Sequence, residues 1–474
     1  MIEIKEKDKC CGCYGCFNIC PVNAISMKED SYGFRYPIVD KEKCINCGMC
    51  EKVCPILNKP KRENINKDND FNLDEDINKN IVKINTINKT EHNFNIESSI
   101  KENKSVAFAA YNKNKDERIK SSSGGIFTLI AKAILNEGGV VYGASFDNDF
   151  SVKHVRIDKT QDIEKLRTSK YVQSLIGDTY KNAKKDLEEG KKVLFTGTPC
   201  QINGLYAYLQ KNYDNLYTQD IICHGVPSPK VWREYLKYRE IKDQKKPMRI
   251  NFRQKVPFGW NLFSLSFDNE YNTKHGEDQY MKMFLQNVSL RDSCFNCNFK
   301  DKNRISDITL ADFWGINKVE PEMNDDKGTS LLIINSQKGN ELLEKIRAEI
   351  EIKETNLDEA IKYNPAMISS VPMNPNRENF FRNINELEKN NLKEKNLGEN
   401  TLGESTLQKS TDENNRLDEN NFCILKEKEL EENKAQDEEL NFEKIVKKYE
   451  YKPSFMDRVK GKCKRVVKKI LRKK

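Results

Sequence analysis

The first 55 residues contain two copies of the spacing Cys-x2-Cys-x2-Cys-x3-Cys-Pro. The first copy is Cys10, Cys13, Cys16 and Cys20 before Pro21, and the second is Cys44, Cys47, Cys50 and Cys54 before Pro55. In this arrangement three thiolates face one iron-sulfur cube, while the fourth cysteine of each copy reaches across to the sister cube. We therefore predict two 4Fe-4S clusters, one bound by Cys10, Cys13, Cys16 and Cys54 and the other by Cys44, Cys47, Cys50 and Cys20.

Two other interpretations of these cysteines are a disulfide framework and a pair of zinc sites. Zinc favours two well-separated pairs of ligands, and disulfides have no reason to repeat one register, so the cluster prediction is preferred. Cys11 lies outside the register and is not expected to be a ligand. Residues 1–57 resemble the bacterial two-cluster ferredoxin, which implies an α+β head. The chain continues far beyond a ferredoxin, so we expect the clusters to serve an active site in the remainder.

Composition divides the rest of the chain. Only 37% of the 474 residues are hydrophobic, so part of the chain cannot form a packed core. Residues 58–103 and 383–452 are rich in Asn, Lys, Glu and Asp and contain few aromatic residues. Such segments bury too little apolar surface to offset their ordering entropy, so we predict a low-complexity linker and a polar, partly helical spacer. Residues 104–382 then form the larger domain.

The location of the protein follows from what the sequence lacks. No run of 18 apolar residues is present, and the N-terminus Met1-Ile2-Glu3-Ile4-Lys5 has no signal-peptide core. We therefore expect a cytoplasmic protein. Fifteen cysteines in a reducing compartment indicate metal ligands rather than disulfides.

The net charge of +8 is concentrated at the C-terminus. Residues 454–474 contain ten Lys or Arg and one acid, a net +9, so the remainder is close to neutral and no nucleic-acid partner is expected. Within residues 453–474, apolar residues such as Val459, Val466 and Ile470 recur at helical spacing. This basic amphipathic helix either adsorbs to an anionic membrane surface, at the inner face of the cell membrane, or packs on the body of the protein.

Residues 104–382 alternate between helix and strand patterns. Ser123, Gly124 and Gly125 open an apolar helix that ends at Gly138, and a strand follows at residues 140–142. A second unit has a helix over 178–189, a strand over 193–195 and a helix through 209. A helix start of this kind binds anions such as phosphate, although a plain helix cap explains Ser-Gly-Gly equally well. No G-x-G-x-x-G is present, so a standard Rossmann fingerprint is excluded.

Four more cysteines lie in this block: Cys200, Cys223, Cys294 and Cys297. From their spacing alone they fit a third cube or a zinc ion, and Cys200 and Cys223 also fit buried thiols. Cys423 and Cys463 fall in spacer and tail sequence and are expected to be free. The four histidines are scattered, without a catalytic pattern.

Six motifs in order resemble the beta-subunit family of deazaflavin (coenzyme F-420) hydrogenases and dehydrogenases. They are Ser122-Ser123-Gly124-Gly125-x-x-Thr128, Lys170-Tyr171-Val172-Gln173-Ser174, Gly197-Thr198-Pro199-Cys200-Gln201, Cys223-His224-Gly225, Ser293-Cys294-x-x-Cys297, and Asp307 to Gly315. The resemblance implies a larger α/β iron-sulfur flavoprotein domain with FAD and a third 4Fe-4S cluster. Its flavin contacts are expected at Ser123, Gly124, Gly125, Thr128, Lys170, Tyr171, Gln173 and Ser174, and its cluster ligands at Cys200, Cys223, Cys294 and Cys297.

The resemblance implies an iron-sulfur flavin oxidoreductase. Electrons from a redox partner protein or ferredoxin-type donor are expected to enter through the head, and FAD to exchange a hydride with deazaflavin or another organic acceptor. Two alternatives stay open: a flavin-dependent reductase in envelope polysaccharide biosynthesis, and a non-catalytic subunit that delivers electrons to a separate enzyme. Neither the acceptor nor the catalytic residues follow from the sequence.

Overall fold

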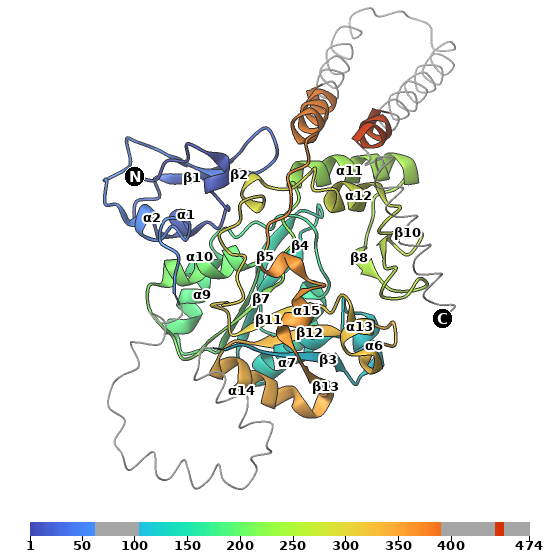
Figure 1. Cartoon of the computed structure of the whole chain (residues 1–474). Helices are drawn as coiled ribbons and strands as arrows, with labels where there is room; N and C mark the ends of the chain where they lie inside the picture. The colour runs from blue at the N-terminus through green and yellow to red at the C-terminus, as the bar shows by residue number, and fades with distance from the viewer. Residues whose placement is uncertain (62–103, 390–440, 450–474) are drawn as a thin grey trace, which may run out of the picture.

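The computed structural model describes residues 1–61, 104–389 and 441–449, which form a small head and a larger mixed α/β body (Figure 1). The predicted tail helix at 453–474, Cys423, Cys463 and most of the predicted linker lie outside these residues. Within the described ranges, no helix is both long and apolar enough to cross a membrane.

The head is built around two short helices and a hairpin. Its elements are η1 (Lys7–Lys9), α1 (Gly15–Ile19), β1 (Ile25–Glu29), β2 (Arg35–Val39) and α2 (Met49–Lys52). β1 and β2 pair antiparallel, with Ile25 opposite Val39. The residues before the two helices, Tyr14 and Gly48, adopt left-handed backbone angles that turn the chain sharply after Cys13 and Cys47. These turns let closely spaced cysteines of each copy face one centre.

An eight-stranded mixed sheet forms the body, in the order β13-β3-β12-β11-β7-β6-β4-β5. The strands are β3 (Val106–Asn112), β4 (Val140–Phe146), β5 (Val152–Ile157), β6 (Val193–Thr196), β7 (Leu216–Ile221), β11 (Ile308–Asp312), β12 (Ser330–Ile334) and β13 (Ile350–Thr355). The four strands β4, β6, β7 and β11 are parallel, and the outer strands pair antiparallel. Val193, Leu194 and Phe195 are fully buried, as expected of a parallel strand covered on both faces.

Helices cover both faces of this sheet. The long ones beside it are α7 (Ile126–Asn136), α9 (Thr179–Glu188), α10 (Pro199–Leu209) and α14 (Gln337–Ile346), and the shorter elements are α6 (Lys115–Ile119), η3 (Thr160–Asp162), α8 (Ile163–Leu166), α13 (Ile316–Val319), η5 (Pro321–Met323), η6 (Arg347–Glu349), α15 (Leu357–Ile361) and η7 (Pro365–Met367). Val141 and Leu194 pack with α7 and α14, whereas Tyr142 and Phe195 pack with α9 and α10. The predicted helices that correspond to α7, α9 and α10 and the predicted strand β6 are therefore confirmed to within two residues at each end. β4 extends four residues beyond the predicted 140–142, and β5 was not predicted.

A third sheet and an aromatic core lie beside the main sheet. The strands β8 (Ile250–Gln254), β9 (Ser264–Phe267) and β10 (Tyr271–Lys274) pack with α11 (Pro229–Asp243) and α12 (Gln279–Leu285). Residues 377–389 and 441–449 are helical and join the same core through side chains such as Phe381 and Phe442. Part of the segment predicted as polar spacer is thus packed, because apolar residues recur within it at helical spacing.

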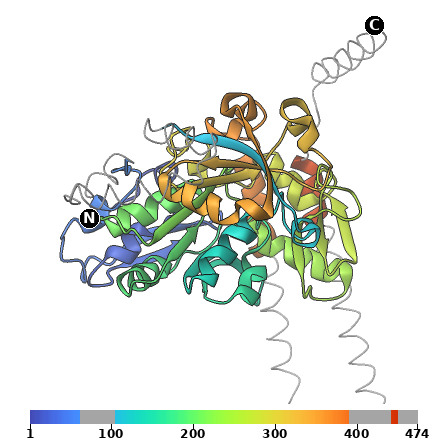
Figure 2. The same ribbon diagram turned by 90° about the horizontal axis from the view of Figure 1, so that it is seen from below.

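The head packs on one end of the body, beside α9 and α10 (Figures 1 and 2). Asn18 donates a hydrogen bond to the Gly177 carbonyl at 2.8 Å, and the Ser228 hydroxyl donates to the Tyr32 carbonyl at 2.5 Å. The Tyr32 ring stacks on Phe381, with centroids 4.2 Å apart. Polar and aromatic contacts at both ends of the head therefore fix its position on the body.

Candidate metal centres

The first cysteine set of the head is Cys10, Cys13, Cys16 and Cys54. Burial raises the pKa of the Cys16 thiol well above its ordinary value, and the nearby thiols of Cys13, Cys10 and Cys54 raise it further. Burial raises the pKa of Cys54 too, with Cys13 and Cys10 again as neighbours. Cys54, from the second sequence copy, thus lies beside the first three cysteines, in the crossed arrangement expected of two cubes.

The second set is Cys20, Cys44, Cys47 and Cys50, which together line one cavity in the head. Apolar side chains, including Ile25 and Val39, complete its wall. The backbone N–H of Ala24 donates to Cys20 Sγ at 3.2 Å, and that of Ile2 donates to Cys50 Sγ at 3.3 Å. Such hydrogen bonds stabilise thiolate sulfur, so the donor set fits an anionic iron-sulfur cluster.

The third set, from the body, lines a second cavity, which contains Cys200, Cys223, Cys294 and Cys297 together with Cys11 of the head. Cys200 lies in the first turn of α10 after β6, and Cys223 follows β7. Because β6 and β7 are parallel, both cysteines lie at the same edge of the sheet. Cys294 ends η4 (Asp292–Cys294) and Cys297 follows it.

Local hydrogen bonds hold two of these cysteines in place. A capping box between Thr198 and Gln201 starts α10, and Thr198 Oγ1 lies 3.1 Å from Cys200 Sγ. The Val226 N–H donates to Cys294 Sγ at 3.4 Å. In the described ranges, no three His, Cys, Asp or Glu side chains converge in the manner of a single-ion site, and the cysteines of the third set surround a cavity.

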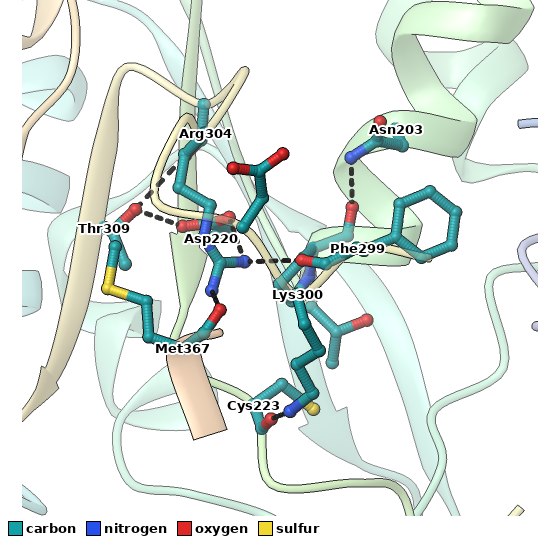
Figure 3. A network of polar contacts seen from close by, with 12 residues as sticks. Asn203, Asp220, Cys223, Phe299, Lys300, Arg304, Thr309 and Met367 are labelled. Carbon is teal, nitrogen blue, oxygen red and sulfur yellow. Dashed lines mark hydrogen bonds and ion pairs between the residues drawn. The ribbon is translucent and has the colours of Figure 1, made fainter. Parts of the chain in front are cut away.

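Three cations line the third cavity, namely Arg291, Lys300 and Arg304. No carboxylate is among the residues that line it. Lys300 donates to the carbonyls of Cys223 and Ala366, and Arg304 pairs with the buried Asp220 at 3.4 Å (Figure 3). A cube held by four thiolates carries net negative charge, which cations in a buried site stabilise. The lining therefore fits an iron-sulfur cluster by its sulfur donors and by its charge.

The first and third cysteine sets meet at the seam between α1 and α10. Cys11 and Cys13 pack against Cys200, and a hydrogen bond from the Cys11 thiol lowers the pKa of Cys200 below that of an ordinary thiol. Gly204 permits this approach, because a Cβ there would lie 2.8 Å from the Cys13 Cβ. Cys11 is therefore a component of the seam that its sequence position did not indicate.

The expected flavin contacts form two groups in the structure. The first group surrounds the start of α7. The Ser122 hydroxyl accepts a hydrogen bond from the Ser169 N–H at 2.8 Å, which brings the Ser-Gly-Gly loop beside the Lys170 segment. Four of the expected residues belong to this loop and α7: Ser123, Gly124, Gly125 and Thr128. Gly124 has no room for a side chain, since a Cβ would lie 2.5 Å from the Ala110 carbonyl oxygen.

Lys170 and Tyr171 lie next to this loop. The Lys170 ammonium donates to the carbonyls of Lys165, Arg167 and Thr168, and desolvation lowers the pKa of Lys170 to about 7. The Tyr171 ring stacks on Phe284 with centroids 4.8 Å apart. This region therefore presents a lysine that gains a proton near neutral pH.

Gln173 and Ser174 form the second group, which faces the seam. Gln173 Nε2 donates to the Cys11 carbonyl at 3.2 Å, and its Oε1 accepts from Arg291 at 3.0 Å. Ser174 Oγ contacts His154 Nδ1 at 2.9 Å and accepts from Gln201 at the same distance. The eight expected contacts are thus divided between the loop and the cysteine seam.

Sequence reasoning missed the basic residues of both regions. Arg253 donates to the Ser122 carbonyl at 3.2 Å and Lys255 to the Ser123 carbonyl at 2.7 Å. At the cavity, Arg291, Lys300 and Arg304 come from the segment around the last two cysteines. No local pattern marks these residues, because their partners lie far away in the sequence.

Comparison with known proteins agrees with both resemblances. Residues 9–57 match the family model described as 4Fe-4S dicluster domain, and residues 190–360 match the model for the C terminus of the coenzyme F420 hydrogenase/dehydrogenase beta subunit. A xenon-derivatised structure of the F420-reducing [NiFe] hydrogenase complex from Methanosarcina barkeri is similar at 18% identity and a TM-score of 0.39, over 55% of this chain and 89% of that chain. No curated protein matches the chain.

Proposed function

We propose that the chain is an iron-sulfur flavoprotein that carries electrons between head and body. The proposal is supported by the match of residues 9–57 to a 4Fe-4S dicluster domain and of residues 190–360 to the C terminus of the coenzyme F420 hydrogenase/dehydrogenase beta subunit. The two head sets hold one 4Fe-4S cluster each. Cys200, Cys223, Cys294 and Cys297 hold a third. The observation that carries the proposal is the seam, where Cys13 and Cys200 pack beside the same buried thiol, Cys11.

The protein's own contribution is to place and shield these centres. Gly204 keeps α1 and α10 close, and Phe299, which is 3% exposed, covers the contact between Cys11 and Cys13. The cations of the third cavity offset negative charge that would otherwise be costly to bury. When bound, the clusters would supply one-electron transfer and FAD would supply two-electron chemistry.

FAD is proposed at the Ser-Gly-Gly loop, and the acceptor is proposed to be deazaflavin or another organic molecule. The α7 N-terminus supports an anion site there, and so do Lys170 and Lys255, because desolvation lowers both pKa values to about 7 and an adjacent anion would favour their protonated forms. We expect denatured protein to release FAD, and Gly125→Asp to lose it, because a carboxylate repels the diphosphate. Gly125→Ala is the matched control, since a side chain at this position strains the backbone at φ +83° in both variants, but alanine adds no negative charge. FMN or no flavin in well-folded, cluster-loaded protein would contradict the assignment.

Electron transfer itself is tested with anaerobically reconstituted full-length protein. The reduced protein is mixed with a panel of acceptors that includes deazaflavin, and flavin oxidation is followed by absorbance. We expect the wild-type protein to transfer electrons from its head clusters to an acceptor. In Cys200→Ala, electrons on the head clusters should not reach any acceptor. Equal rates in the two proteins would overturn the route across the seam, whereas transfer only to a protein partner would identify a non-catalytic subunit.

A further inference from the structure

Arg291 is buried at the seam and belongs to both sides of it. Its side chain is fully buried, and its guanidinium donates to the Cys10 carbonyl at 2.8 Å and to the Arg35 carbonyl at 3.1 Å, both in the head. A third bond, at 3.0 Å, reaches Gln173 in the body. The guanidinium lies 4.2 Å from the centroid of the Tyr36 ring. The side chain is therefore held rigidly by neutral groups.

Within the part of the chain that the structure describes, no carboxylate forms a hydrogen bond or an ion pair with Arg291. All three hydrogen-bond acceptors of Arg291 are neutral oxygens. The nearby buried Arg377 differs, because it pairs with Asp292 at 2.8 Å. Burying a cation without a counter-charge is strongly unfavourable. An anion at the seam would remove this cost.

The position of Arg291 indicates that the compensating anions are the clusters of the first and third cysteine sets. It binds the carbonyl of Cys10, a ligand of the first set, and it lines the cavity of the third set beside Cys294. Gly12, between Cys11 and Cys13, allows the close approach, since a Cβ there would lie 2.9 Å from Arg291 Nη1. Arg291 is absent from the lining of the second cavity. Its charge thus acts on two of the three centres.

We propose that Arg291 is a positioning residue that serves as the shared counter-ion of the first head cluster and the third cluster, and that it raises the reduction potentials of both relative to the second head cluster. The inference rests on the proposed third cluster. Reduction adds negative charge, so a fixed cation nearby favours the reduced form. Electrons would then collect at the seam.

The test is a potentiometric titration of the anaerobically reconstituted full-length protein, followed by electron paramagnetic resonance. Cys294→Ala assigns the third wave and Cys47→Ala the second. We expect Arg291→Met to move the first and third waves to lower potential and to leave the second in place, while Arg291→Lys restores part of the shift. A purely structural role would not give this charge-dependent pattern.

Gln173→Glu provides a second test that keeps the guanidinium in place. The new carboxylate would pair with Arg291 across the present 3.0 Å contact, with loss of the amide's bond to the Cys11 carbonyl. The same two waves are expected to fall. Unchanged midpoint potentials in Arg291→Met would overturn the proposal. If Arg291→Met does not load clusters, unchanged midpoint potentials in Gln173→Glu would overturn it instead. Iron analysis of wild type separates the two claims: about eight irons would reject the third cluster, and Arg291 would then be judged on the first wave alone.

Discussion

The third cysteine cavity and the Ser-Gly-Gly loop both contain buried cations, but they balance charge differently. At the loop, each arginine has a carboxylate: Arg118 pairs with Asp325 at 2.6 Å, Arg167 with Glu117 at 2.6 Å and Arg253 with Asp312 at 2.8 Å. At the cavity, Arg291 and Lys300 contact neutral acceptors only, among the described residues. The arginines of the loop are thus neutralised by carboxylates, and its two lysines that contact only carbonyls, Lys170 and Lys255, have their pKa values lowered to about 7 by desolvation. Arg291 at the cavity instead keeps its charge without a paired carboxylate, which suits an anionic cluster.

The largest expected effect comes from removing the carboxylate of Asp220, which pairs with the cavity cation Arg304. Asp220 and Arg304 are 2% and 3% exposed, and removing one partner of such a buried pair costs about 3–5 kcal/mol. Because a bound cluster would offset part of the freed charge, we expect Asp220→Asn to lower the melting temperature of apoprotein more than that of cluster-loaded protein.

Asp312→Asn is the matched control at the loop, where it releases Arg253. It should destabilise the apoprotein and the cluster-loaded protein equally, because no cluster is proposed there. Equal losses for Asp220→Asn as well would erase the distinction between the two regions.

The next effect concerns the seam. Gly204→Val would place new atoms within 3 Å of Cys13 and Tyr180, and overpacking of this kind costs about 1–3 kcal/mol. We expect the variant to keep its clusters and to transfer electrons from head to body more slowly, as measured by stopped-flow absorbance. Gly276→Val, at a site with open space around it, should behave as wild type. Normal transfer in Gly204→Val would show that close packing at this glycine is not required.

The smallest effect is a pH dependence at the loop. The pKa of Lys170 falls from 10.5 to about 7 on folding, so the unfolded chain binds more protons between these values. The free energy of unfolding therefore rises with pH across this window, by at most about 1.4 kcal/mol per pH unit. Below pH 7 the folded protein bears the full destabilisation from burying the protonated Lys170 side chain. We expect wild type to gain melting temperature relative to Lys170→Met between pH 7 and 9. A constant difference would show that Lys170 titrates normally.

Sequence alone predicted the features whose signals are local. The cysteine spacing predicted both head sets, the apolar run after Ser-Gly-Gly located α7, and the strand pattern at 193–195 followed by a helix through 209 located α10. It did not predict Arg291, whose contact with Cys10 joins residues 281 positions apart. Gln173 and Lys170 share one motif yet lie in different regions, because the chain between them passes from the loop to the seam. Long-range packing decides such cases, and no local pattern encodes it.

The central claim is that four cysteines of the body hold a third 4Fe-4S cluster beside the head. Iron analysis of anaerobically reconstituted full-length protein tests it most directly, with Cys294→Ala as the comparison. We expect about twelve irons per chain in wild type and about eight in the variant, since each cube contains four. About eight irons in both proteins would contradict the claim and favour zinc or free thiols at the cavity.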